Sequence, residues 1–150
     1  MKIQNRERLH RRIAALPQIT KDEIRKGLAD SAQEITELQK RFVPVDTGEL
    51  RDSIVWQYGN TTKIAHSQGV GGDHELSVRI SAGDTYVRYA HLVEFGTAPH
   101  PQGGKFKGTM HPGTAAHPFF YPGYRLGQKR AKSRIGRAVS KAAKKAAGVA

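Results

Sequence analysis

The sequence contains no cysteine, which excludes disulfide bonds, thiolate nucleophiles and cysteine-ligated zinc sites. It also lacks a long apolar run: no stretch approaches the roughly 18 residues of a membrane span, and residues 1–16 are too charged for a signal peptide. Hydrophobic residues make up only 37% of the 150 residues, and the mean hydropathy is −0.59. We therefore expect a single domain, 1–150, with a modest core and no membrane partner.

Acidic residues are absent from the last part of the chain. Residues 1–94 hold 14 Lys and Arg against 13 Asp and Glu, whereas residues 95–150 hold 11 Lys and Arg and no acid. Nine of these eleven lie in 125–150. Such asymmetry indicates that the basic part faces a polyanion or an acidic protein surface. The plainer alternative is a solvated helix whose charges only keep the protein in solution.

Two helices are predicted before residue 44. The first covers 3–16, and the second begins at Thr20, which forms a capping-box pattern with Glu23. The second helix ends before Pro44, because a residue preceding proline disfavours helical geometry. Apolar residues recur along it at helical spacing and predict a buried stripe: Ile24, Leu28, Ile35, Leu38 and Phe42.

The middle of the chain predicts an antiparallel sheet. Apolar and polar residues alternate over 53–58 and again over 76–81, which is typical of strands with one buried face. Residues 63–66 could add a short strand. The fold class is therefore α+β: a small antiparallel sheet packed against a long N-terminal helix, followed by a basic C-terminal helix.

Three further segments complete the chain. Residues 86–95 predict a short helix closed by Gly96, which occupies the position of a left-handed C-terminal cap. Residues 97–118 form a long loop rich in His, Pro and Gly, and a loop of this length is generally functional. Residues 123–147 predict a basic helix whose apolar stripe is thin and needs a partner surface: Leu126, Ile135, Val139 and small alanines.

No catalytic constellation emerges from the sequence. Asp46-Thr47-Gly48 matches the aspartic-protease signature, but that chemistry needs two carboxylates sharing a proton, and here three charged residues follow within four positions. The histidines of 91–117 form no i, i+4 pair and have no following carboxylate to complete a metal site. We expect no enzyme activity and no cofactor.

Nucleic-acid binding rests on composition alone. Residues 125–150 could neutralise phosphates, and about six engaged charges would give a slope of log K against log salt near −5. A basic accessory protein that binds the DNA backbone through 125–150 is therefore the alternative function. The residues concerned are Lys129, Arg130, Lys132, Arg134, Arg137, Lys141, Lys144 and Lys145.

Three separated motifs together resemble a known family. They are Pro-x-Asp-Thr-Gly-x-Leu (Pro44, Asp46, Thr47, Gly48 and Leu50), Tyr-Ala-x-x-Val-Glu-Phe-Gly-Thr (Tyr89, Val93, Glu94, Phe95, Gly96 and Thr97) and Pro-Phe (Pro118 and Phe119). In this order they are similar to the tail-component family of tailed bacteriophages typified by gene product ten of a lambdoid siphophage. The resemblance covers roughly 20–145.

The resemblance implies a virion protein of the head–tail or tail-end junction, such as a tail-completion, neck or minor tail protein. It implies action as a ring, expected to be a hexamer, that docks to neck, tail-terminator or tail-tube proteins, with DNA in the tail channel as a further partner. Assembly would take place in the bacterial host cytoplasm. The motif residues carry over as structural elements: Asp46, Thr47 and Gly48 cap the turn after the long helix, and Glu94 to Thr97 form the turn into the loop.

Loop position and charge suggest the residues that contact other subunits. Turn capping within the chain is the favoured role of the motif residues over direct partner contact. The interface candidates are Phe106, His111, Phe119, Phe120 and Tyr124, with Arg134 and Lys141 for an acidic partner.

Overall fold

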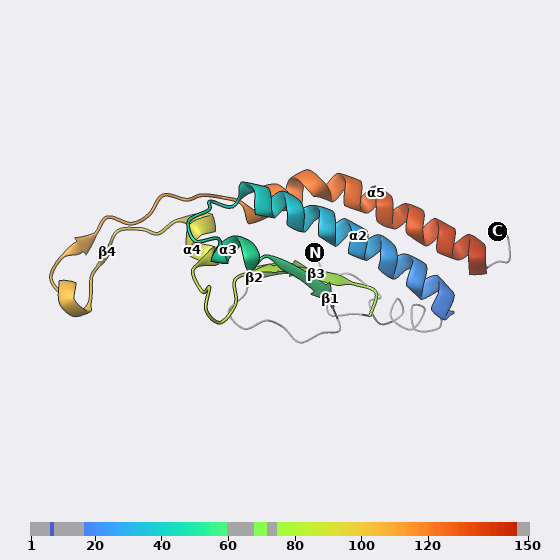
Figure 1. Ribbon diagram of the computed structural model, residues 1–150, viewed down its shortest axis with the longest axis horizontal. Coiled ribbons are helices and arrows are strands. Elements are labelled where there is room, and N and C mark those ends of the chain that lie inside the picture. The colour runs from blue at the N-terminus through green and yellow to red at the C-terminus, as the bar shows by residue number, and fades with distance from the viewer. Residues whose placement is uncertain (1–6, 8–16, 60–67, 72–74, 147–150) are drawn as a thin grey trace.

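The computed structural model describes residues 7, 17–59, 68–71 and 75–146 (Figure 1). Apart from residue 7, the predicted helix over 3–16 lies outside these residues, as does the strand at 63–66. The helices are α2 (Gln18–Phe42), α3 (Glu49–Asp52), α4 (Ala90–Phe95) and α5 (Phe120–Ala146), with one 3₁₀ turn, η1 (Gly104–Phe106). The strands are β1 (Val55–Tyr58), β2 (Gln68–Gly71), β3 (Val78–Ala82), β4 (His100–Pro101) and β5 (Met110–His111).

The long helix α2 begins at Gln18, directly after Pro17, so the predicted capping box at Thr20 is wrong. The Pro17 carbonyl accepts hydrogen bonds from the backbone N–H groups of Thr20 (3.0 Å) and Lys21 (3.1 Å). The helix has no side-chain cap, and Thr20 is buried in its first turn. Proline suits this position because it lacks the N–H that a helix start leaves unpaired. The predicted end at Phe42, before Val43 and Pro44, is confirmed.

The sheet has three strands in the order β1-β3-β2, and the central β3 pairs antiparallel with both neighbours. β1 and β3 correspond to the two strands predicted by alternation. Ile80 lies opposite Trp56 on one side and Val70 on the other. Trp56 points toward the helix layer, where its indole N–H donates to Gln33 of α2 at 2.8 Å. Ile54, Trp56 and Ile80 belong to the core as the alternation predicted, but the polar residues Arg79 (8% exposed) and Ser81 (0%) of β3 are buried as well.

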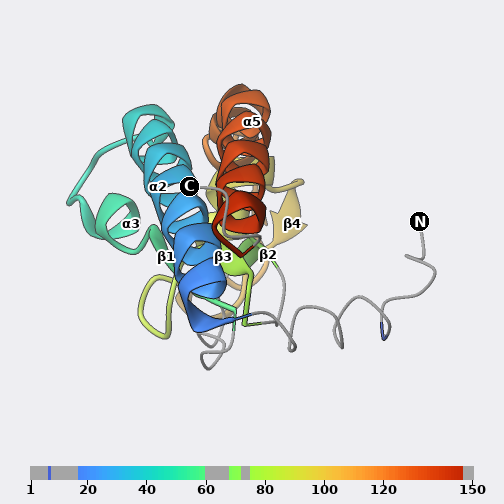
Figure 2. The same cartoon turned by 90° about the vertical axis from the view of Figure 1, so that its right-hand side faces the viewer.

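Helices α2 and α5 lie side by side and antiparallel on one face of this sheet, which confirms the α+β class (Figures 1 and 2). The main core lies between the two layers and includes Ile35, Ile54, Ile80 and Phe119. A smaller cluster of Ile24, Leu28 and Ala142 continues it toward the far ends of the two helices. None of the helices in the described part of the chain is long and apolar enough to cross a membrane.

Small residues allow α2 and α5 to approach closely. A Cβ added at Gly123 would lie 2.6 Å from the Gln39 side chain and 2.9 Å from its backbone nitrogen. One added at Gly127 would lie 2.7 Å from Ile35. The predicted apolar stripe of this helix is therefore only partly right: its alanines and Ile135 pack, with glycines beside them, but Leu126 and Val139 are exposed. The partner surface that the helix needs is α2 itself.

Helix α4 begins at Ala90, four residues after the predicted start. The Asp84 carboxylate accepts the backbone N–H groups of Tyr86 (2.7 Å) and Val87 (2.8 Å), which holds this stretch as a turn before the helix. Gly96 closes α4 with a φ of 71°. This positive φ favours glycine, but with ψ −176° Gly96 is not the left-handed helical cap that the sequence predicted.

Residues 97–114, here called the arm, form an antiparallel ribbon that projects from the end of the molecule where α4 lies (Figure 1). β4 pairs with β5, η1 lies at the tip, and Thr97 pairs with Thr114 at the base. The sequence predicted only a long loop over 97–118. Its short, proline-containing strands gave no alternating pattern that would have indicated pairing.

Candidate functional site

The start of α5 poses a hydrogen-bonding problem, because the first N–H groups of a helix have no partner within it. No Ser, Thr, Asp or Asn precedes Phe120, so the helix has no local cap. Glu94 of α4 supplies the acceptor instead. One carboxylate oxygen accepts the N–H groups of Phe119 and Phe120, both at 2.8 Å, and the other accepts that of Tyr121 at 3.1 Å. Pro122 has no N–H, so the first turn is fully satisfied.

Glu94 is therefore a helix cap rather than part of the turn into the loop. Its side chain is only 3% exposed, and its negative charge lies at the positive end of the α5 dipole. The Val93 carbonyl adds a hydrogen bond from the His117 N–H at 2.8 Å. The second and third motifs of the sequence thus form one structural unit. The signal was present in the sequence, because Glu94 is the last acid before an uncapped helix.

The base of the arm is held by paired threonines. Thr97 and Thr114 exchange backbone hydrogen bonds of 3.0 and 3.1 Å, and their hydroxyls lie 2.8 Å apart. Gly96 and Gly113 permit this approach: a Cβ on Gly96 would lie 2.5 Å from the Thr114 carbonyl oxygen, and one on Gly113 would lie 2.3 Å from that of Thr97. The second motif therefore sets the direction in which the arm leaves the body.

The first motif does not cap α3 as predicted. Gly48 occupies the N-cap position with φ 91°, and no side chain caps the helix. The Thr47 hydroxyl makes only a long contact with the Glu49 N–H, at 3.5 Å. Asp46 is turned away from the helix start because the left-handed Gly48 redirects the chain between them. Its predicted capping role is wrong.

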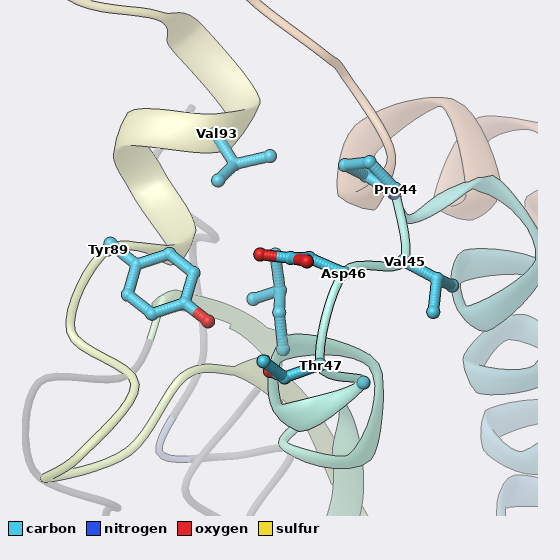
Figure 3. A pocket seen from close by; sticks show the side chains of 8 residues that line it. Pro44, Val45, Asp46, Thr47, Tyr89 and Val93 are labelled. Carbon is cyan, nitrogen blue, oxygen red and sulfur yellow. The ribbon is translucent and has the colours of Figure 1, made fainter.

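Asp46 instead lines an open pocket of about 320 Å³ between the α2–α3 connection and α4. Figure 3 shows its carboxylate directed toward the space between Tyr89 and Val93. The walls are formed by members of the first and second motifs: Pro44, Val45, Asp46, Thr47, Gly48, Leu50, Tyr89 and Val93. Residues that are 45 positions apart in the chain thus share one concave surface.

The pocket is apolar apart from one carboxylate and two hydroxyls. Asp46 is exposed, and among the described residues no group donates a hydrogen bond to it or pairs with its charge. Of the described side chains that line the pocket, none is a second carboxylate or a histidine. In the described part of the chain, no three His, Cys, Asp or Glu residues gather as a metal site would require. The arrangement is suited to receiving an apolar group with a neighbouring positive charge.

The interface candidates are distributed unevenly. Phe106 is 66% exposed at the arm tip, and the His111 ring stacks on that of His100 with centroids 5.0 Å apart. Phe119 and Phe120 are each 1% exposed. These two belong to the core and are unavailable to a partner, because the α5 start turns their rings inward. Tyr124 is partly buried against the same core, and its hydroxyl accepts a hydrogen bond from Gln128 at 3.1 Å.

Sequence reasoning missed an exposed apolar surface beside the pocket and on the arm. In α4, Leu92 is 41% and Phe95 63% exposed, and Met110 of the arm is 63% exposed. The helical spacing of Tyr86, Tyr89, Ala90 and Val93, on which the predicted helix over 86–95 rested, indicated a different face. Leu92 and Phe95, three positions apart, form a second stripe that the sequence shows equally well.

Two carboxylates of α2 neutralise part of the basic helix. Glu34 pairs with Arg130 (2.8 Å) and Arg134 (2.7 Å). Glu23 pairs with Lys141 (3.0 Å) and Lys145. Hydrogen bonds from Lys145 and then Lys141 lower the pKa of Glu23 to about 2. Arg134 and Lys141, predicted to meet an acidic partner, thus have their acids within the chain.

The remaining described basic residues of α5 do not pair with Glu23 or Glu34, and one of them, Lys132, borders a groove shared with Ala32 of α2 and Ile80 of β3. Arg125, Lys129, Lys132, Arg137 and Lys144 are exposed, and each lacks a carboxylate partner among the described residues. Arg137 makes one contact, a 3.4 Å hydrogen bond to the Ser133 hydroxyl. The outward face of α5 is therefore the unneutralised part of the basic helix.

The comparisons with known proteins identify one family. The family model described as "Bacteriophage HK97-gp10, putative tail-component" matches residues 7–96. No curated protein and no solved structure gives a significant match. The matched region includes α2, the pocket and α4 with the Glu94 cap, and it covers more than half of the chain. The chain therefore belongs to the HK97-gp10-like family of bacteriophage tail components.

Proposed function

We propose that this protein is a structural subunit at the head–tail or tail-end junction of a phage or prophage-derived particle, where it completes the tail. It acts without a catalytic step, by self-association into a ring, expected to be a hexamer, and by docking to neck or tail proteins. Assembly takes place in the host cytoplasm before the subunit is incorporated into the virion. The family supports a virion tail component, and the finer role is argued from the surface.

The observation that carries the proposal is the concentration of exposed apolar side chains at one end of the molecule. Leu92 and Phe95 lie on α4, at the root of the projecting arm, and Phe106 and Met110 lie on the arm itself (Figure 1). Soluble monomers rarely expose a large contiguous apolar patch unless another protein covers it. A closed ring would bury these side chains in every copy, whereas a monomer would leave them all in water.

Native mass spectrometry of the full chain tests this role. We expect one discrete oligomer, alone or after addition of the tail-tube protein, and we expect the double variant Leu92→Ser/Phe95→Ser to shift it toward monomer. The matched control is Val139→Ser, because Val139 is 46% exposed in the second half of α5, far from the α5 start that Glu94 caps. A monomer that binds no neck or tail protein would refute the proposal. Truncation after Tyr124 would be uninformative, because it removes the helix that covers α2.

A second candidate function, binding of the DNA backbone through 125–150, is favoured by the outward face of α5. Five exposed basic residues follow this helix without a carboxylate partner among the described residues. Four others are paired with Glu23 and Glu34, so fewer charges are available than composition suggested. If all five engage phosphates, log K should fall with log salt at a slope near −4.5.

Titration of duplex DNA at several salt concentrations tests this alternative. Lys129→Ala/Lys132→Ala should reduce the slope by about 2 if these residues contact phosphates. Lys141→Ala should change it little, because that ammonium group is paired with Glu23. Equal effects of the two variants, or binding that is insensitive to both, would argue against the α5 face.

A further inference from the structure

The arm carries exposed apolar side chains that lie too far from the rest of the same chain to be covered by it. From the Thr97–Thr114 base to the η1 tip the ribbon is seven residues long, which at about 3.3 Å per residue puts the tip roughly 20 Å from the base. At and near the tip, Phe106 is 66% and Met110 63% exposed. A contact that buries these side chains must therefore come from another molecule.

The pocket beside the base of the arm is concave, whereas the arm projects. Its walls include Pro44, Leu50 and Val93, and its volume of about 320 Å³ is in the range of sites that enclose a small apolar group. Of the described residues that line it, Asp46 is the only charged one, and it is exposed. Asp46 has no partner among the described residues.

The arm matches this pocket in charge as well as in polarity. Lys105 and Lys107 flank Phe106, and residues 95–124 contain no acid. Both lysines are exposed, and neither forms a salt bridge with any described residue. An aromatic side chain between two ammonium groups is thus complementary to an apolar pocket whose one charged residue, among those described, is Asp46 with its carboxylate.

We propose that the arm of one copy inserts Phe106 into the Asp46 pocket of a second copy, with Lys105 or Lys107 against the Asp46 carboxylate. The inference rests on the proposed self-association and names the contact that produces it. The arm and the pocket are different surfaces, so the contact between two copies is heterologous. Each copy offers a free arm or pocket to the next copy, and the chain of contacts ends when the rotation between neighbouring copies closes a ring. The first and second motifs would then form both the receiving pocket and the support from which the arm projects.

Cross-linking of single-cysteine chains tests the contact, because the natural sequence has no cysteine to add background. Val45→Cys places a thiol on the pocket wall, and Lys105→Cys places one at the arm tip. A mixture of the two variants, treated with a short bis-maleimide, should give cross-links between unlike chains, and the double variant should give a ladder ending at the ring size. Ser140→Cys on the outward face of α5, mixed with Lys105→Cys, is the control and should give none.

The outcomes separate this inference from the general proposal. An oligomer with no link between Lys105→Cys and Val45→Cys, or with tip-to-tip links only, refutes the arm contact and leaves the ring intact. Tip links to a tail protein alone assign the arm to that partner and also refute it. A monomer at every concentration refutes both. Phe106→Ala should weaken association at least tenfold, and Asp46→Lys should be rescued by Lys105→Glu/Lys107→Glu if the charges meet.

Discussion

Replacement of Glu94 by alanine should be among the most destabilising single substitutions in the described part of the chain. The carboxylate accepts three N–H groups at 2.8, 2.8 and 3.1 Å and is 3% exposed. Its loss leaves three donors at the α5 start without a partner, two of them on the buried residues Phe119 and Phe120. Loss of a helix cap alone costs about 1 kcal/mol, and each buried unpaired donor costs roughly 1–3 kcal/mol.

These contributions are not additive, and water entering the space reduces them, so we expect a loss of about 4 kcal/mol for Glu94→Ala. A small domain has a total stability of about 5–15 kcal/mol, so the variant would lose a large share of it. At about 3 °C per kcal/mol for a chain of this size, the Tm should fall by roughly 12 °C. Glu94→Gln should lower the stability by about half as much. Its amide oxygen still accepts hydrogen bonds from the helix start, but the negative charge at the end of the helix is removed.

Urea denaturation followed by far-ultraviolet circular dichroism measures both variants. The control is Glu37→Ala, an exposed carboxylate on α2 that contacts only Gln33 within one turn, and it should change stability by less than about 0.5 kcal/mol. If Glu94→Ala lowers the free energy of unfolding no more than Glu37→Ala does, the capping role of Glu94 is refuted. An equal loss for Glu94→Ala and Glu94→Gln would show that only the negative charge matters.

Two further predictions concern the contact between α2 and α5. The pKa of Glu23 is lowered from 4.5 to about 2, so its ionised form favours the folded state; this contribution is present above about pH 4.5 and is lost as the pH falls toward 2. The stability gap between the natural chain and Glu23→Gln should therefore narrow over this range in acid denaturation, and a constant gap would contradict the pairing with Lys141 and Lys145. Gly123→Ala should destabilise by about 1–2 kcal/mol despite the better helix propensity of alanine, because its Cβ would meet the Gln39 backbone at 2.9 Å, whereas Gly136→Ala, with open space around it, should stabilise by up to about 1 kcal/mol. Similar thermal shifts for the two glycine variants would refute the close packing.

Local sequence patterns predicted most of the secondary structure because they depend on residues a few positions apart. The apolar spacing of α2 and the alternation in β1 and β3 are visible within single segments. Start positions were less well predicted. α2, α4 and α5 begin at Gln18, Ala90 and Phe120, where Pro17, the Asp84 turn and the Glu94 cap place them. The last of these depends on a residue 25 positions away.

The sequence predicted which motifs belong to the candidate site, but not how their residues are positioned relative to one another. Asp46 and Gly96 were identified as important residues, and their placement in the pocket and at the arm base followed only from the structure. The basic helix shows the same limit. The sequence showed nine charges in 125–150, but not that Glu23 and Glu34 would neutralise four of them.

The sequence by itself determined the α+β class, the one-sided charge and the family, because composition, periodicity and the order of motifs can be read without knowing which residues are in contact. The tertiary structure alone decided which carboxylate caps α5, which cations face solvent and which motif residues share the pocket. Each of these depends on bringing together residues from 25 to more than 100 positions apart. Such contacts form where packing places the elements, and local propensity does not encode them.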